Sequence, residues 1–449
     1  MALDSNFYRK MLGIAIPVVL QDLLVNSLTF IDTLMIGQLG TASIAAVGLA
    51  NQLSFLINLF FFGVSTGASI FIAQYYGADN KKGIGNVMAL GTLVSIIGAT
   101  VFCILALSIP DKIMRLYTKD ENVVALAVSY LRYIGPSFFC LALTKMFSIG
   151  LRSTGNPVVP LGSSILSMVS DIILNYFLIF GIAFFPEMGV RGAALATTLS
   201  RLMETVVILT YTYRHKSPCA ITERSSFRFS RPFLHSVIPT CIPVVCNEFF
   251  WAVGMTIYKI AYGKLGTEVL AAVNVNESVS NMFFTAMFGV ANSSLIMIGQ
   301  KIGEKRPEEA RVYCRRFLIL SCVVGAIMGV CQALFSPQLV RLFSIGGPVA
   351  LTAQYCLYTN ALLFPLRSFD TTMIVGVLRS GGDTRYSMLS ELGSVWLIGI
   401  PMAFLGCTVF KLPIWYVYLL VGLEEVSKGI LGYVRVKSGR WLKDLSKTA

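Results

Sequence analysis

Two stretches of this chain read almost alike, GLRSTGNP at residues 150–157 and VLRSGGDT at residues 377–384, at an offset of 227. Further matches lie at an offset of 226, where GQLGT at 37–41 returns as GKLGT at 263–267 and PVV at 17–19 returns at 243–245. Matches at one nearly constant offset are the signature of an internal repeat. We infer that the chain consists of two related halves.

The composition indicates that lipid surrounds most of the chain. Hydrophobic residues make up 55% of the 449 residues and charged residues 13%, whereas a soluble domain carries roughly 25% charged residues. A helix needs about 20 apolar residues to cross the hydrocarbon of a bilayer. We therefore predict an all-α polytopic membrane protein with twelve transmembrane helices. The twelve apolar runs lie at 11–36, 43–77, 86–109, 123–149, 158–181, 190–213, 236–262, 269–300, 315–335, 349–376, 386–410 and 412–434.

Each half contains six predicted helices, so both halves insert in the same orientation and are related by an axis roughly along the membrane normal. The predicted division is a six-helix lobe at 1–213, a polar cytoplasmic linker at 214–232 and a second six-helix lobe at 233–449. Repeats of this kind are typical of secondary transporters, whose substrate sites lie between the repeats near the bilayer midplane.

The net charge of +13 is distributed unevenly along the chain. Of 36 lysines and arginines, 23 fall at the termini and in the even-numbered loops, seven fall in the odd-numbered loops, and six lie in or near helices. Basic residues are retained on the cytoplasmic side, so we predict an inner-membrane protein with both termini in the cytoplasm. No basic stretch carries the interleaved aromatic residues of a nucleic-acid reader, so we expect no nucleic-acid partner.

The sequence lacks the usual motifs of enzymes and cofactor sites. The ten cysteines form no CxxC pair, the two histidines stand 20 residues apart, and no GxxxxGK[ST] motif occurs. These absences argue against a structural metal site and against a nucleotide site. We expect a transporter that is not an enzyme, needs no cofactor, and draws its work from an ion gradient.

Acidic residues inside the apolar runs are the first candidates for function. A carboxylate at bilayer depth costs at least about 2.5 kcal/mol and usually faces a cavity. The fifth run offers Asp171 and Asn175 one helical turn apart, and the sixth offers Thr197 and Thr198 at a matching depth. In the first run one polar stripe is predicted, with Asp32 beside it, made of Asp22, Asn26, Thr29 and Thr33.

The second half has its own acids. Glu248 stands about 12 residues into its helix, which is roughly 18 Å of rise and close to the midplane. We predict that Glu248 and Glu277 supply negative charge to a cavity and hold a sodium ion or a cationic substrate, because carboxylates are hard oxygen ligands. Asp370 is a further cavity candidate, with an internal ion pair to Arg367 as the alternative.

The repeat shows where the acids of the two halves diverge. Asp22 corresponds to Glu248, whereas Asp32 corresponds to Tyr258. The ion-binding machinery is therefore not duplicated. In the last run we expect Glu424 and Glu425 to pair with Lys428 along their own helix.

The sequence resembles the multidrug and toxic compound extrusion (MATE) family over essentially its whole length. The similarity is carried by FIDTLMIG at 30–37, by Glu248 and by the two motifs at 150–157 and 378–384. The resemblance implies a V-shaped exporter that expels amphipathic organic cations in exchange for protons or sodium ions. It also implies that Asp32 joins a polar network with the fifth and sixth helices, and that Pro17 is a bend-prone proline. Asp171 precedes Asn175, which reverses the order in proton-coupled relatives.

Two other function classes stay open. A flippase for lipid-linked precursors would need a basic cavity to hold pyrophosphate, and an intramembrane enzyme would need a nucleophile and base. Within the repeated motifs, we expect Arg152 and Arg379 to cap helix ends or to pair with a loop acid. Asp383 and its neighbouring glycines favour a tight turn. The partners we expect are organic cations and membrane lipids, and we expect the protein to be a monomer.

Overall fold

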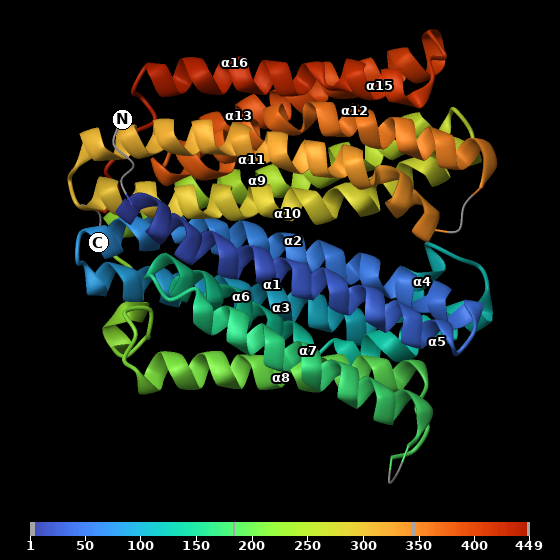
Figure 1. The fold of residues 1–449 in the computed structure, drawn as a ribbon. Coiled ribbons are helices and arrows are strands. Elements are labelled where there is room, and N and C mark those ends of the chain that lie inside the picture. The colour runs from blue at the N-terminus through green and yellow to red at the C-terminus, as the bar shows by residue number, and fades with distance from the viewer. Residues whose placement is uncertain (1–4, 183–184, 344–345, 447–449) are drawn as a thin grey trace. The chain divides into compact units, whose positions relative to one another are not determined.

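The computed structural model describes residues 5–182, 185–343 and 346–446, and all regular structure within them is helical (Figure 1). Ten helices in this part of the chain are long and apolar enough to cross a membrane. An eleventh span is counted if α5 (Glu121–Ile134) and α6 (Ser137–Ser153), which meet at a bend of 53°, form one crossing. The predicted all-α class is confirmed.

The helices of the first half follow the predicted apolar runs closely. Asp120 begins α5 because its carboxylate accepts from the backbone N–H groups of Asn122 and Val123, which caps the helix. The helix α7 (Val158–Phe180) ends at Gly181, which has a left-handed conformation with φ of 66° that glycine adopts without strain. The remaining helices are α1 (Ser5–Gly37), α2 (Thr41–Gly77), α3 (Lys81–Ser108), α4 (Pro110–Arg115) and α8 (Val190–Arg214).

The helices of the second half are more often interrupted. The twelfth predicted run is divided at Gly422 into two shorter helices, and π-helical turns interrupt the tenth and eleventh runs at Thr372–Leu378, Val395–Gly399 and Leu405–Val409. Such turns insert an extra residue into the helix and are frequent at functional sites. The helices are α9 (Arg231–Gly263), α10 (Thr267–Gly303), α11 (Pro307–Leu342), α12 (Gly347–Thr371), α13 (Thr384–Ser394), α14 (Ile400–Phe404), α15 (Ile414–Val421) and α16 (Leu423–Lys437).

The chain divides into two compact units. Unit 1 holds the described residues of Met1–Val19, Ala73–Asn80 and Pro232–Thr448, and unit 2 holds Leu20–Ile72 and those of Lys81–Arg231. Helices α1 and α2 thus each contribute residues to both units. The division at 1–213 and 233–449 that the repeat suggests stays a prediction.

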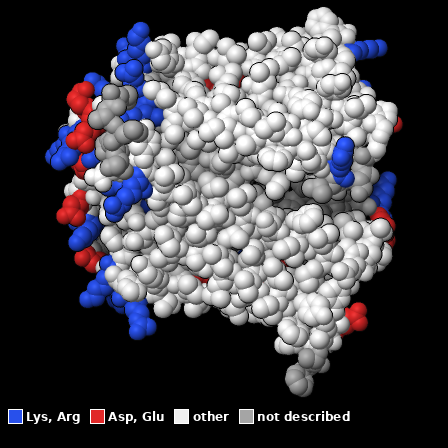
Figure 2. Space-filling model, viewed as in Figure 1, with Lys and Arg blue, Asp and Glu red and all other residues white. Residues whose placement is uncertain are grey.

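Each unit has its own apolar core. In unit 1, Phe7 packs edge-on against Tyr313 and Phe317, with ring centroids 4.9 and 5.0 Å apart. In unit 2, the core includes Phe61, Leu131 and other buried residues of α2 to α8. Outside these cores, large apolar side chains remain exposed on most of the long helices. Figure 2 shows a mostly uncharged surface in this view, with Lys and Arg gathered near helix ends. This pattern agrees with helices that face lipid.

Candidate functional site

The first candidate site is a carboxylate cluster in unit 2, formed by α1, α7 and α8. Asn175 Nδ2 donates to Asp32 Oδ1 at 2.9 Å and to Asp171 Oδ2 at 2.8 Å. Ser200 Oγ donates to the other oxygen of Asp171 at 2.8 Å. Asp171 and Asn175 are buried, whereas Asp32 is only half-buried. One amide therefore bridges two carboxylates, and three of the four residues predicted for ion coupling lie together.

The sixth transmembrane helix reaches Asp171 through two residues. Ser200 Oγ donates to Asp171 at 2.8 Å, and the side chain of Thr197 also interacts with Asp171. Thr198 Oγ1 donates to the carbonyl oxygen of Tyr133 at 2.9 Å. Thr197 and Ser200 are three residues apart and so share roughly one helix face. The sequence therefore identified the face and Thr197, but not Ser200.

The polar stripe on α1 does not join this cluster. Thr29 Oγ1 donates to the carbonyl oxygen of Val25 at 3.1 Å, and Thr33 Oγ1 donates to that of Thr29 at 2.8 Å. Asn26 and Thr29 are exposed within the structure. Ser and Thr side chains often bond back to their own helix in this way. The stripe is therefore a separate polar face, and the substrate role predicted for Asn26 and Thr29 stays a prediction.

Arg201 on α8 supplies the positive charge of the Asp32 cluster. Its Nη1 donates to Ser137 Oγ at 2.8 Å, and its charge acts on both Asp32 and Asp171. In the sequence, Arg201 is one of the six basic residues in or near helices. Two carboxylates facing one guanidinium leave one negative charge to be balanced, and an unbalanced buried charge is costly. A proton or another cation can supply that balance.

A second polar network in unit 2 surrounds Arg152. Arg152 Nη2 donates to Gln21 Oε1, and Gln21 Nε2 donates to Ser164 Oγ at 2.7 Å. Ser164 Oγ in turn donates to Glu204 Oε1 at 2.6 Å. Asp22 and Glu204 act electrostatically on both Arg152 and Lys145. Of the two roles expected for Arg152, pairing with a loop acid is not what its hydrogen bond shows, because its partner is Gln21 on α1.

Unit 1 contains the repeat-related counterpart of this network. Arg379 Nη2 donates to Glu248 Oε1 at 2.8 Å and lies 4.0 Å from Glu391 Oε2. Asn247 Nδ2 donates to the same Glu391 oxygen at 2.8 Å. These four residues stand 226 or 227 positions after Gln21, Asp22, Arg152 and Ser164. Both halves therefore gather equivalent positions around the motif arginine, although Arg152 bonds Gln21 whereas Arg379 bonds Glu248, the counterpart of Asp22.

This arrangement gives Glu248 a cationic partner. Arg379, which is only 1% exposed, forms an ion pair with its carboxylate. The two residues are 131 positions apart in the sequence, so no local pattern indicates their contact. A sodium ion at Glu248 would have to compete with a guanidinium already in place.

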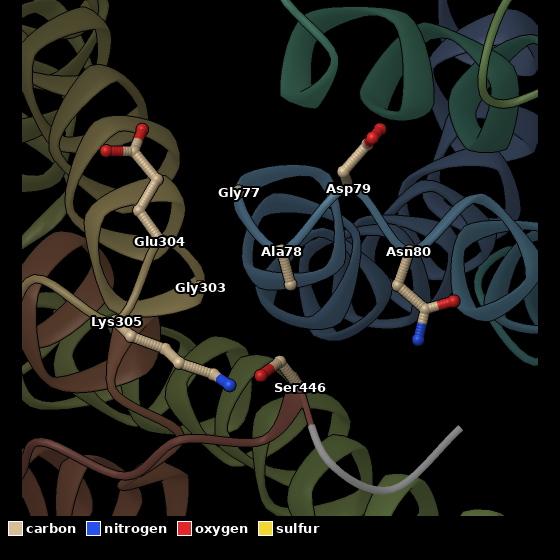
Figure 3. Close-up of a pocket in the computed structure, with 8 residues that line it drawn as sticks. All are labelled: Gly77, Ala78, Asp79, Asn80, Gly303, Glu304, Lys305 and Ser446. Carbon is tan, nitrogen blue, oxygen red and sulfur yellow. The ribbon is translucent and has the colours of Figure 1, made fainter.

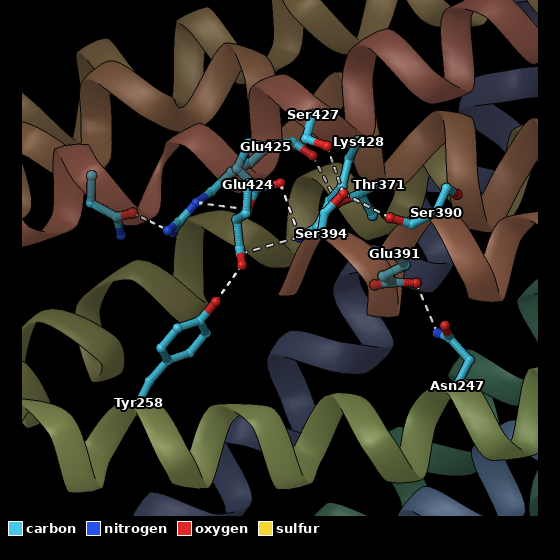
Figure 4. A network of polar contacts seen from close by, with 12 residues as sticks. Asn247, Tyr258, Thr371, Ser390, Glu391, Ser394, Glu424, Glu425, Ser427 and Lys428 are labelled. Carbon is cyan, nitrogen blue, oxygen red and sulfur yellow. Dashed lines mark hydrogen bonds and ion pairs between the residues drawn. The ribbon is translucent and has the colours of Figure 1, made fainter. Parts of the chain in front are cut away.

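A denser charged network lies in unit 1 around α16 (Figure 4). Lys428 Nζ lies 3.2 Å from Glu424 Oε1 and 3.3 Å from Glu425 Oε2. The Tyr258 hydroxyl donates to the second oxygen of Glu424, and Arg367 Nε lies 3.5 Å from the second oxygen of Glu425. All three charged side chains of α16 in this network are buried. The predicted pairing of Glu424 and Glu425 with Lys428 along the helix is confirmed, and the ion pairs are buried inside the protein.

Asp370 lies beside this network and interacts with the carboxylate of Glu425. It is 3% exposed. Arg367 instead bonds Asn360 and pairs with Glu425, so the alternative ion pair between Arg367 and Asp370 is wrong. Asp370 Oδ1 lies against Gly429 of α16. Gly429 directly follows Lys428 in the sequence.

Glu277 lies apart from the ion pair of Glu248. It pairs with Lys259 of α9 at 2.7 Å, and both side chains are partly exposed. Its neighbour Asn276 donates to the Tyr418 hydroxyl at 3.2 Å. The structure therefore provides Glu248 and Glu277 with separate cationic partners, and their predicted roles toward sodium or substrate stay predictions.

The second arginine motif holds the C-terminal segment. Asp383 accepts from Arg435 Nε at 2.6 Å and from Lys443 Nζ at 2.7 Å. Burial acts to raise the pKa of Asp383, but the hydrogen bonds from Arg435 and Lys443 lower it overall. The buried Trp441 packs against Gly381, where a side chain would clash with its backbone. The motif therefore forms a docking surface as well as the predicted turn.

A cavity of about 450 Å³ lies at the ends of α2 and α10 in unit 1 (Figure 3). Its lining includes Asp79, Lys305 and Ser446 from the turns and the C-terminal segment. None of the residues predicted for ion coupling line it. Among the described residues no group of three or more His, Cys, Asp and Glu side chains is placed to hold a metal ion.

Comparisons with known proteins agree with this architecture. The MatE family model matches residues 17–177 and 243–405, two segments that begin 226 residues apart, as the repeat does. The chain is 27% identical to "Uncharacterized transporter YisQ" of Bacillus subtilis, over 92% of this chain and 90% of the relative. It is 24% identical to "Probable multidrug resistance protein NorM" of Thermotoga maritima, over 97% of this chain and 93% of the relative.

Solved structures show the same fold. One is described as "Crystal structure of MATE in complex with MaL6" and superposes with a TM-score of 0.86 at 19% identity. Another is an outward-facing conformation of a multidrug resistance MATE family transporter, with a TM-score of 0.87 at 19% identity. Each comparison covers 96% of both chains. The likeness therefore extends to the complete fold.

Proposed function

The chain belongs to the MatE family, a family of multidrug efflux transporters, and from that premise we propose that it exports amphipathic organic cations in exchange for protons or sodium ions. The observation that carries this proposal is the Asp32 cluster in unit 2. A half-buried carboxylate there shares one amide donor with a fully buried carboxylate. Buried ionisable groups in membrane proteins mark ion pathways and proton relays.

The charge balance of the cluster explains how ion and substrate could exclude each other. Asp32 and Asp171 carry two negative charges when ionised, and Arg201 balances one of them. A proton, a sodium ion or a cationic substrate can balance the second, but two at once would leave excess positive charge. Exchange follows when binding of one cation favours release of the other.

The same cluster gives a route from ion binding to conformational change. Neutralising Asp32 weakens its charge-assisted hydrogen bond with Asn175 and so changes how α1 is held against α7. Pro17, earlier in α1, removes one backbone donor and is a point at which the helix can bend. An ion that binds one conformation more tightly shifts the population toward it.

We place the protein in the inner membrane as a monomer, with both termini in the cytoplasm.

One observation supports a second candidate substrate class. Lys145 and Arg152 are half-buried basic residues of unit 2, and a flippase for lipid-linked precursors requires basic groups to hold pyrophosphate. Glu204 and Asp22 act on both cations electrostatically. Because acids already balance these cations, we favour the organic-cation exporter and treat an anionic amphiphile as the alternative.

Transport in everted vesicles separates these proposals. An ethidium-like fluorescent cation should accumulate against its gradient when a proton or sodium gradient is imposed, and dissipating that gradient should stop accumulation. Vesicles without the protein give the background. Translocation of a pyrophosphate-linked lipid with no gradient-driven cation transport would support the flippase instead. Failure of both transport reactions in folded protein would contradict the proposed function.

A further inference from the structure

Lys428 occupies an equivalent repeat position to Arg201, at an offset of 227. In unit 2, Arg201 acts on the carboxylates of Asp32 and Asp171. In unit 1, Lys428 lies between the carboxylates of Glu424 and Glu425 (Figure 4). Both repeats therefore place a basic side chain of their sixth transmembrane segment beside two acids, although the acids themselves come from different positions.

The carboxylates around Lys428 are held in place from both sides. Lys428 Nζ contacts one oxygen of Glu424 at 3.2 Å and one oxygen of Glu425 at 3.3 Å. The hydroxyl of Tyr258 binds the other Glu424 oxygen. The remaining Glu425 oxygen faces the Arg367 guanidinium. Two fixed carboxylate oxygens thus converge on one ammonium group, and such oxygens are also the ligands that hard metal cations prefer.

Asp370 supplies independent support for a cation site at this place. Its carboxylate is 3% exposed, interacts with the carboxylate of Glu425, and lies against Gly429, the neighbour of Lys428 on α16. Four acids therefore act on Lys428, namely Glu424, Glu425, Glu391 and Asp370. Removing Lys428 would increase this excess of negative charge, and a buried unpaired charge is strongly destabilising.

We propose that Lys428 is a tethered cation that occupies the carboxylate site of α16 and prevents a free sodium ion from binding there. Its ammonium takes the position at which Glu424 and Glu425 would coordinate a metal ion, and the helix keeps its local concentration high. This proposal deepens the proposed function, because it makes Lys428 a residue that determines which ion unit 1 accepts. It does not depend on transport for its test.

The test is equilibrium binding of radioactive sodium ions to purified protein in detergent. Wild type is compared with Lys428→Met, which removes the ammonium and keeps a side chain of similar length. Lys301→Met is the matched control, because Lys301 also bridges two carboxylates, Glu304 at 2.8 Å and Glu309 at 2.9 Å, but at an exposed helix end. Water hydrates those acids, so we expect no new sodium site in the control.

We expect Lys428→Met to bind about one more sodium ion per protein than wild type, and Glu424→Gln in that background to abolish the gain. A Lys428→Met protein that melts cooperatively and binds no additional sodium would overturn the proposal. If that variant does not fold, the wild-type background decides the question. The double variant Glu424→Gln/Glu425→Gln is then compared with wild type, with Lys428 present in both proteins. Equal sodium binding by the two proteins supports the proposal that Lys428 closes the site. If the double variant binds less sodium than wild type, the ammonium of Lys428 does not exclude the ion.

Discussion

Replacing Arg379 by methionine should destabilise unit 1 strongly. The guanidinium is 1% exposed, lies 2.8 Å from Glu248 and 4.0 Å from Glu391, and both carboxylates keep little exposure. Removing one partner of a buried ion pair costs about 3–5 kcal/mol, because it leaves an uncompensated charge. Glu248→Gln should cost less, about 1–3 kcal/mol, since Arg379 keeps Glu391 nearby and an amide oxygen still accepts its hydrogen bond.

The assay is equilibrium unfolding in mixed detergent, followed by circular dichroism. The double variant should cost less than the sum of the two single variants, with a coupling energy of about 2 kcal/mol, because the residues are in direct contact. Arg311→Met is the control, since Arg311 pairs with Glu308 at 3.0 Å in an exposed position, and it should cost less than about 1 kcal/mol. If Arg379→Met cost no more than this control, or if the single effects were additive, the buried ion pair would not stabilise unit 1 more than an exposed pair does.

Three further predictions concern the C-terminal segment and the linker between the halves. Trp441→Ala should cost about 3–5 kcal/mol, because the indole is buried in the core of unit 1, and limited proteolysis should then cut the C-terminal segment faster than in wild type. Burial raises the pKa of Asp383 but Arg435 and Lys443 lower it overall. Its stabilisation is therefore present above the ordinary carboxyl pKa of 3.8 and lost as pH falls through the lower folded value; Asp383→Asn should remove that part of the acid dependence of melting. Arg224→Cys, at an exposed linker position, should react with an impermeant maleimide only after cells are permeabilised, and labelling from outside intact cells would contradict the topology.

Much of the fold was predictable because the bilayer limits the alternatives. Helices of about 20 apolar residues are the main way for this composition to span a membrane, and the repeat predicts an equal number in each half. The interruptions were not predictable in the same way. The bend between α5 and α6 and the division at Gly422 lie inside apolar runs, and hydrophobicity carries no information about local backbone geometry.

The candidate site was predictable only where its signal was local. Asp171 and Asn175 are one helical turn apart, and that spacing places them on one face. Arg201 was missed because an isolated basic residue in an apolar helix has no spacing pattern with acids on other helices, whereas the pairing of Lys428 with Glu424 and Glu425 was predictable from their spacing along one helix. The repeat offset of 227 that relates Arg201 to Lys428 was the available signal. The Arg379 contact with Glu248 spans 131 residues, so it required the tertiary structure.

The central claim is that Asp32 couples the ion gradient to transport. The most direct measurement is uphill efflux of a fluorescent organic cation by Asp32→Asn, compared with wild type at matched expression and under the same imposed gradient. An asparagine side chain can still hydrogen-bond but cannot carry the charge that a proton or sodium ion neutralises. The account predicts that the variant folds, binds the cation and shows no gradient-driven accumulation. Accumulation at the wild-type rate would contradict it and would move the search for the coupling group to Asp22 and Glu248.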